Sequence, residues 1–158
     1  MALTLRSAKE SIEKETAACI SFQQFVQLHE TAVYTFCYRM LGSRHPAESA
    51  AECAFLDTCP RFPAVSLVDV LTAAVLRCRE QLRGSGLWGE TAVNDVQHVF
   101  NQLPVPEREV MALRYGCQLN FTEIASILNT SGEGVRDALR QARWHAVSLE
   151  SARLARQN

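Results

Sequence analysis

The chain has 158 residues, of which 47% are hydrophobic and 21% charged, and its 16 Lys and Arg are balanced by 17 Asp and Glu. This composition excludes a disordered protein, and the near-zero net charge argues against a protein that binds nucleic acid unaided, although it is compatible with delivery to DNA by a larger partner. No apolar run is long enough to span a bilayer and residues 1–14 contain no signal-peptide core, so we expect a cytoplasmic protein without membrane contact.

Helical periodicity dominates the first half of the chain. Residues 21–41 carry apolar side chains at helical spacing, with His29 inside the stripe as a core or interface residue, and Gly42 ends this helix. Pro46 suits the first turn of a second helix that runs to about Thr58, and Glu48 is expected in the same turn.

A third helix is predicted to begin after Ser66 and to run to about Arg83. Asp69, three residues after Ser66, is the expected partner in a capping box. The glycine-rich segment that follows, which contains Trp88, is the clearest linker in the chain.

Shorter helices follow the linker. Apolar spacing predicts a helix up to Leu103 and another that opens at Pro104 and Pro106 and stops at Gly116. Asn120 is expected to cap a two-turn helix, with Glu123 at its third position.

Residues 129–131 form a tight connection to a last helix that Ser131 caps. A short helix, a three-residue turn and a longer amphipathic helix describe a helix-turn-helix. The outward face of the last helix presents Arg136, Arg140 and Arg143, although an ordinary solvated face would look similar.

These elements predict an all-α fold of two small helical domains joined by a Gly-rich linker, with the helix-turn-helix in the second domain. The expected boundaries are residues 1–19 for an N-terminal extension, 20–83 for the first domain, 84–90 for the linker, 91–150 for the second domain and 151–158 for a C-terminal tail.

Six cysteines raise the question of a disulfide or a metal site. No pair forms C-x-x-C and no histidine falls at zinc-finger spacing, so buried reduced thiols are the favoured interpretation. His45 with Cys53 and Cys59 is the only cluster that merits a chemical test. The histidines form no triad and no glycine-rich phosphate loop follows a strand, so we expect no enzyme, no catalytic residue, no metal and no cofactor.

Several segments resemble parts of one known family. Residues 103–115 (LPVPEREVMALRY), 119–128 (LNFTEIASIL) and 131–143 are similar to the opening of the fourth domain of sigma factors, the first helix of its helix-turn-helix and its recognition helix. Residues 39–42, 47–48 and 55–56 resemble the second domain of the same proteins. Together these segments resemble the extracytoplasmic-function (ECF) group of the sigma-70 family, which keeps only domains 2 and 4.

The resemblance implies partners and site residues. In that family domain 2 binds the polymerase clamp helices and melts the proximal promoter element, while domain 4 holds the polymerase flap and reads the upstream element. The implied partners are core RNA polymerase, promoter DNA bound together with polymerase, and an anti-sigma factor. By position, the residues that face polymerase are Glu48, Ser49, Glu52 and Asp57. The residues expected at DNA are Ser131, Glu133, Arg136, Arg140 and Arg143, with Arg77 and Arg79 in the first domain.

The sequence also departs from the family pattern. Ser49 and Cys53 replace usual carboxylates, and Ala138 and Gln141 replace usual arginines. The third helix lacks the aromatic side chain on which melted bases would stack. Two hypotheses stay open: an active sigma factor, or a sigma-like protein that binds polymerase with a partner or occupies an anti-sigma factor. We also expect a compact free chain that buries DNA-facing surface until a partner opens it.

Overall fold

The structure is a computed structural model that describes residues 20–84 and 94–157, and all regular structure within these ranges is helical. The predicted extension 1–19, linker residues 85–90 and Trp88 lie outside the described residues. The first domain contains α2 (Phe22–Leu41), α3 (Arg44–Thr58), a 3-10 turn (Cys59–Arg61) and α4 (Leu67–Gly84).

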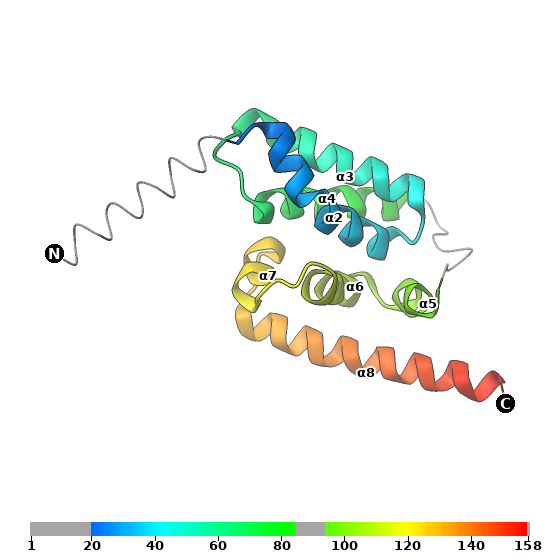
Figure 1. The fold of residues 1–158 in the computed structure, drawn as a ribbon. Helices are drawn as coiled ribbons and strands as arrows, with labels where there is room; N and C mark the ends of the chain where they lie inside the picture. Colours follow the sequence, from blue (N-terminus) through cyan, green and yellow to red (C-terminus); the bar gives the residue numbers. More distant parts are fainter. Residues whose placement is uncertain (1–19, 85–93, 158) are drawn as a thin grey trace.

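The second domain contains α5 (Asp95–Gln102), α6 (Val105–Met111), a π-helical turn (Ala112–Gly116), α7 (Phe121–Leu128) and α8 (Gly132–Gln157). Helices α7 and α8 form the predicted helix-turn-helix, and the all-α fold with two helical domains is confirmed (Figure 1). No helix in the described ranges is both long and apolar enough to cross a membrane.

Local hydrogen bonds explain most helix ends. The Ser66 and Asp69 side chains accept from each other's backbone N–H at 3.3 and 2.8 Å, so the predicted capping box is confirmed. Asn120 and Glu123 form a second capping box at the start of α7. Gly42 ends α2 at a φ of 70°, a left-handed conformation that favours glycine.

Two helices differ from the expectation. Helix α3 begins at Arg44, so Glu48 lies beyond its first turn, where it instead accepts a hydrogen bond from Arg44 at 2.7 Å. Helix α8 continues through the expected tail to Gln157, because Arg153 bonds both to Glu150 on the same helix and to Asp95 on α5.

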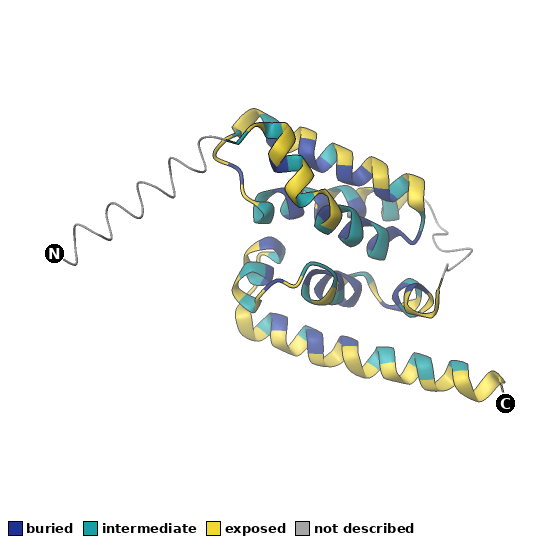
Figure 2. Ribbon diagram, in the orientation of Figure 1, coloured by how far each residue is buried: buried dark blue, intermediate teal, exposed yellow. Residues whose placement is uncertain are grey.

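The two domains are docked against each other. Helices α2 and α4 of the first domain contact α5, α6, α7 and the π-helical turn of the second (Figure 1). Buried side chains from both domains form one continuous hydrophobic cluster, and α8 packs on the second domain with its outer side exposed (Figure 2). The domain interface therefore fixes how the surfaces of the two domains lie relative to each other.

Replacing Ser66 by alanine is expected to lower the free energy of unfolding by about 1 kcal/mol, because the α4 capping box is lost. Hydrogen bonds from Ser66 hold the pKa of the Asp69 carboxyl below its ordinary value. Their contribution is therefore complete above pH about 3.9 and is lost as the pH falls through the lower folded-state pKa. Urea titrations at neutral and acid pH measure this difference.

Ser43→Ala is the matched control, because Ser43 precedes α3 without a side-chain capping bond. Equal destabilisation by both substitutions would contradict the assignment of the energy to the capping box.

Candidate protein-docking and DNA-facing surfaces

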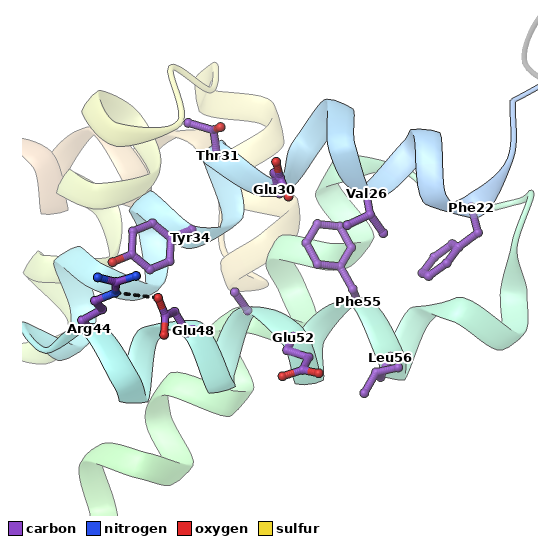
Figure 3. Close-up of a pocket in the computed structure, with 11 residues that line it drawn as sticks. Phe22, Val26, Glu30, Thr31, Tyr34, Arg44, Glu48, Glu52, Phe55 and Leu56 are labelled. Atoms are coloured by element: carbon purple, nitrogen blue, oxygen red, sulfur yellow. Dashed lines mark hydrogen bonds and ion pairs between the residues drawn. The ribbon is translucent and has the colours of Figure 1, made fainter.

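A groove of about 740 Å³ runs between α2 and α3 on the first domain (Figure 3). Its apolar lining comes from both helices, and Leu56 in it is 61% exposed. The main apolar residues are Phe22, Val26, Tyr34, Ala51, Phe55 and Leu56. Such an exposed apolar groove is typical of a site that binds an apolar side of a partner protein.

Carboxylates line the same groove. Glu30, Glu48 and Glu52 face it together with one cation, Arg44 (Figure 3). The hydrogen bond from Arg44 holds the pKa of the Glu48 carboxyl below its ordinary value, so this group is charged at neutral pH. An apolar lining with a net negative rim is complementary to a helix that carries apolar and basic side chains.

The structure separates the four residues that the resemblance assigns to polymerase. Glu48 and Glu52 both line the groove, whereas Ser49 is exposed outside it. Asp57 accepts two hydrogen bonds from Arg77 on α4, at 2.7 and 2.8 Å, and these bonds lower the pKa of its carboxyl. Sequence reasoning missed Tyr34 and Leu56. Leu56 belongs to a segment that resembles the family. Helical periodicity alone did not show that this leucine is exposed on α3 and not buried in the core.

The start of α8 has the geometry of a helix-turn-helix recognition element. The Ser131 hydroxyl accepts from the Gly134 N–H at 3.0 Å, and Glu133 is exposed beside it. A side chain at Gly134 would place its Cβ 2.7 Å from the Thr130 hydroxyl. The glycine therefore permits the close approach of the turn to the first turn of α8.

Three arginines extend along the exposed side of α8. The guanidinium of Arg136 lies 5.8 Å from the centre of the Phe121 ring, and Arg140 bonds to Asp137 at 2.6 Å. Arg143 donates to the Tyr115 hydroxyl at 2.6 Å. All three side chains are accessible in the docked arrangement, so this face remains available to phosphate or base edges.

The two arginines expected at DNA in the first domain are instead held in ion pairs. Arg77 binds Asp57 within the first domain. Arg79 donates from Nε and Nη2 to the two carboxylate oxygens of Glu109 on α6, at 2.6 and 2.8 Å, and the Glu109 side chain is 3% exposed. The Asp57 and Glu109 carboxylates therefore offset the positive charge that these two arginines would present to DNA.

The domain interface also contains buried polar contacts at the end of α2, which we call the polar seam. Arg108 donates from Nη1 to the Met40 carbonyl at 2.7 Å and from Nη2 to the carbonyls of Asn101 and Leu103. Burial lowers the pKa of the Arg108 guanidinium. A side chain at Gly42 would place its Cβ 2.6 Å from the Asn101 amide oxygen, so the domains approach closely here.

Gln97 completes the polar seam from α5. Its amide oxygen accepts from Arg39 Nη1 at 3.1 Å, and its amide nitrogen donates to the Arg39 carbonyl at 3.2 Å and to Asn101 at 2.8 Å. The residue is fully buried. The two contacts with Arg39 therefore cross between the domains, whereas the bond to Asn101 stays within α5.

The cysteines in the described residues are free thiols. Hydrogen bonding to Cys37 and burial raise the pKa of Cys78, while burial raises the pKa of Cys117 to about 12. Within residues 20–84 and 94–157 no three His, Cys, Asp or Glu are placed to hold a metal ion, and His45, Cys53 and Cys59 are not brought together as ligands.

Comparison with known proteins gives a matching family and a similar sequence. Residues 94–145 match the family "Sigma-70, region 4". The ECF RNA polymerase sigma factor SigW of Bacillus subtilis (strain 168) is 24% identical over 159 residues, covering 78% of this chain and 85% of SigW.

Two solved structures share the fold. CnrH in complex with the cytosolic domain of CnrY superposes with a TM-score of 0.69 at 16% identity, covering 88% of this chain and 94% of CnrH. The sigma factor RpoE of Bartonella quintana, in complex with the anti-sigma factor NepR, gives a TM-score of 0.71 at 15% identity, covering 82% of this chain and 96% of RpoE.

Proposed function

Because the chain belongs to the ECF group of the sigma-70 family, we propose that it binds core RNA polymerase and directs promoter-specific initiation of transcription. The family consists of transcription regulators that are not enzymes. In this proposal the first domain attaches the chain to polymerase and the second domain reads promoter DNA.

The proposal rests on the separation of two surfaces with different chemistry. The α2–α3 groove is apolar and acidic, which suits a protein helix and repels phosphate. Helix α8 presents Arg136, Arg140 and Arg143 on the exposed side of a helix-turn-helix, which suits a DNA groove. With a net charge of −1, the chain depends on a partner for tight DNA binding.

A second candidate is a sigma-like protein that acts through an anti-sigma factor or together with a polymerase-bound partner. The observation that favours it is the pairing of Arg77 with Asp57 and of Arg79 with Glu109, which occupies the basic groups expected to meet melted DNA. The solved relatives CnrH and RpoE were both captured with a second protein, in RpoE an anti-sigma factor.

Transcription with core RNA polymerase on fragmented genomic DNA separates the two candidates. An active sigma factor gives transcripts that start at defined promoters. A complex with core polymerase that never opens promoter DNA would leave only the sigma-like candidate. If no complex with core polymerase forms, the only hypothesis left is a protein that occupies an anti-sigma factor.

Arg140→Ala is expected to reduce the promoter-dependent transcript roughly five- to tenfold, because one phosphate or base contact of about 1 kcal/mol is lost. Arg136→Ala is expected to act in the same direction. Arg156→Ala near the end of α8 is the control, since Arg156 is exposed but lies far from the start of the recognition helix. Transcript levels unchanged by Arg136→Ala and Arg140→Ala would refute the assignment of this face to DNA.

A further inference from the structure

The exposed side of α8 carries a row of large apolar side chains beyond its arginines. Trp144 and Val147 are each 67% exposed, and Leu154 is 49% exposed. Steps of three and seven residues place these side chains on one side of the helix, in line with Arg140 and Arg143. We call these five residues the α8 ridge. The ridge is accessible in the docked chain, so the expectation that a compact chain buries its DNA-facing surface does not extend to the recognition helix.

The α8 ridge is an apolar patch with a basic border. Val96 of α5 is 52% exposed and lies with Val147 at the edge of one space between the two helices, so the apolar surface continues from α8 onto α5. Arg143 donates to the Tyr115 hydroxyl, and this uncharged partner does not neutralise the guanidinium. A contiguous exposed patch of this kind, unlike single exposed apolar residues, is typical of a protein-binding surface.

The α2–α3 groove has the complementary character. It is a hollow between two helices, lined by apolar side chains that include the exposed Leu56 (Figure 3). Three carboxylates line it against one guanidinium, those of Glu30, Glu48 and Glu52 against that of Arg44. A helix that presents apolar and basic side chains matches this groove in polarity and in the sign of its charge. The α8 ridge presents both kinds of side chain.

The ridge and the groove of one chain do not face each other. Figure 1 shows α3 and α8 as outer helices on opposite sides of the chain, with the domain interface between them. The ridge can therefore enter only the groove of another copy while the domains are docked. Two different surfaces then meet, which makes the contact head-to-tail and not symmetric. A net charge of −1 per chain leaves little overall repulsion between copies.

We propose that the α8 ridge of one chain docks in the α2–α3 groove of a second copy. The ridge spans about 15 Å from Trp144 to Leu154, so the interface is small and the association is weak and reversible. Each contact covers the groove of one copy and Arg140 and Arg143 of the other. Free chain at high concentration thus loses access to both surfaces at once. This inference goes beyond the proposed function and does not depend on it.

Sedimentation equilibrium of the full chain tests the ridge. The average mass is expected to rise with concentration from about 1 µM upward, in steps of one chain. Trp144→Glu should weaken the association at least about tenfold, because it removes an exposed aromatic anchor and brings a carboxylate to an acidic groove. Ala152→Glu is the matched control. Ala152 is exposed two residues before Leu154, which turns it about 160° away around the helix.

The groove is tested in the same way with Leu56→Arg. This substitution should also weaken self-association at least about tenfold, because it brings a cation to a groove that receives Arg143. Leu28→Arg is the control, since Leu28 is 71% exposed on α2 outside the groove.

Mixing the two weakened variants identifies the head-to-tail geometry. The Trp144→Glu chain keeps an intact groove, and the Leu56→Arg chain keeps an intact ridge. An equimolar mixture is therefore expected to form a dimer with one chain of each kind, although each variant alone stays monomeric at the same concentration. The dimer should not grow further, because the remaining ridge and groove are both altered.

The proposal is overturned if the unaltered chain is monomeric at all concentrations, or if the mixture stays monomeric. Association of Trp144→Glu or Leu56→Arg as strong as that of the control variants would also overturn it, since another surface would then join the copies. These measurements contain no polymerase. Failure of the unaltered chain to bind core polymerase would defeat the proposed function and leave the self-association standing.

Discussion

Replacing Arg108 by methionine is expected to lower the free energy of unfolding by about 3 kcal/mol. The guanidinium donates to three carbonyl groups, and methionine keeps much of the side-chain length but has no donor. Each buried carbonyl left without a partner costs about 1 kcal/mol or more. The loss includes the bond to Met40, so the effect reaches the first domain from a substitution in the second.

Urea titration followed by circular dichroism measures this loss. Arg156→Met is the control, because Arg156 is exposed and donates to the Ala152 carbonyl of its own helix, and a change within about 0.5 kcal/mol is expected there. If Arg108→Met were no more destabilising than Arg156→Met, the buried carbonyl contacts would not be the stabilising element of the polar seam.

Leu56→Arg is expected to weaken binding to core RNA polymerase about 10- to 100-fold. Burying a leucine side chain in an interface contributes about 1.5–3 kcal/mol, and about 1.4 kcal/mol corresponds to a tenfold change in affinity. The added cation would also repel the basic partner to which the acidic rim of the groove is complementary. Because Leu56 is largely exposed, the fold itself should tolerate the substitution.

Leu28→Arg is the matched control for this experiment. Leu28 is 71% exposed on α2 and does not line the α2–α3 groove. Biolayer interferometry with immobilised core polymerase should find its affinity within about twofold of the unaltered chain, since scattered exposed apolar residues carry little binding energy. Equal weakening by both substitutions would place the polymerase site outside the groove.

Local sequence signals predicted much of the fold. The capping boxes of Ser66 with Asp69 and of Asn120 with Glu123 involve residues three apart, so their hydrogen bonds follow from chain-local geometry. The end of α2 at Gly42 was also predicted, because the left-handed conformation there is a local property that favours glycine. Pro46 lies in the first turn of α3 as expected, but the expected position of Glu48 in the same turn was wrong, because α3 begins two residues before Pro46, at Arg44.

Helical periodicity could not predict how the two domains are arranged. Arg108 belongs to the segment that resembles the family, but its partner carbonyl at Met40 lies 68 residues away. Arg79 and Glu109 are 30 residues apart, and nothing in either helical pattern indicates that they meet. For the candidate site, the resemblance assigned Glu48 and Glu52 to a protein contact, and both line the groove. It did not reveal the apolar groove between them and α2, because that groove depends on how two helices pack.

Three cysteines at the domain contact have a consequence for the chemistry of the chain in solution. Cys37 and Cys78 are buried, and Cys117 of the second domain donates to the Ala32 carbonyl of the first. The thiolate is the form of cysteine that attacks an alkylating reagent, and the raised pKa values of Cys78 and Cys117 keep both groups protonated at neutral pH. Covalent labelling of Cys117 is therefore expected to be slow while its contact with Ala32 is closed, and its rate reports how often that contact between the domains opens.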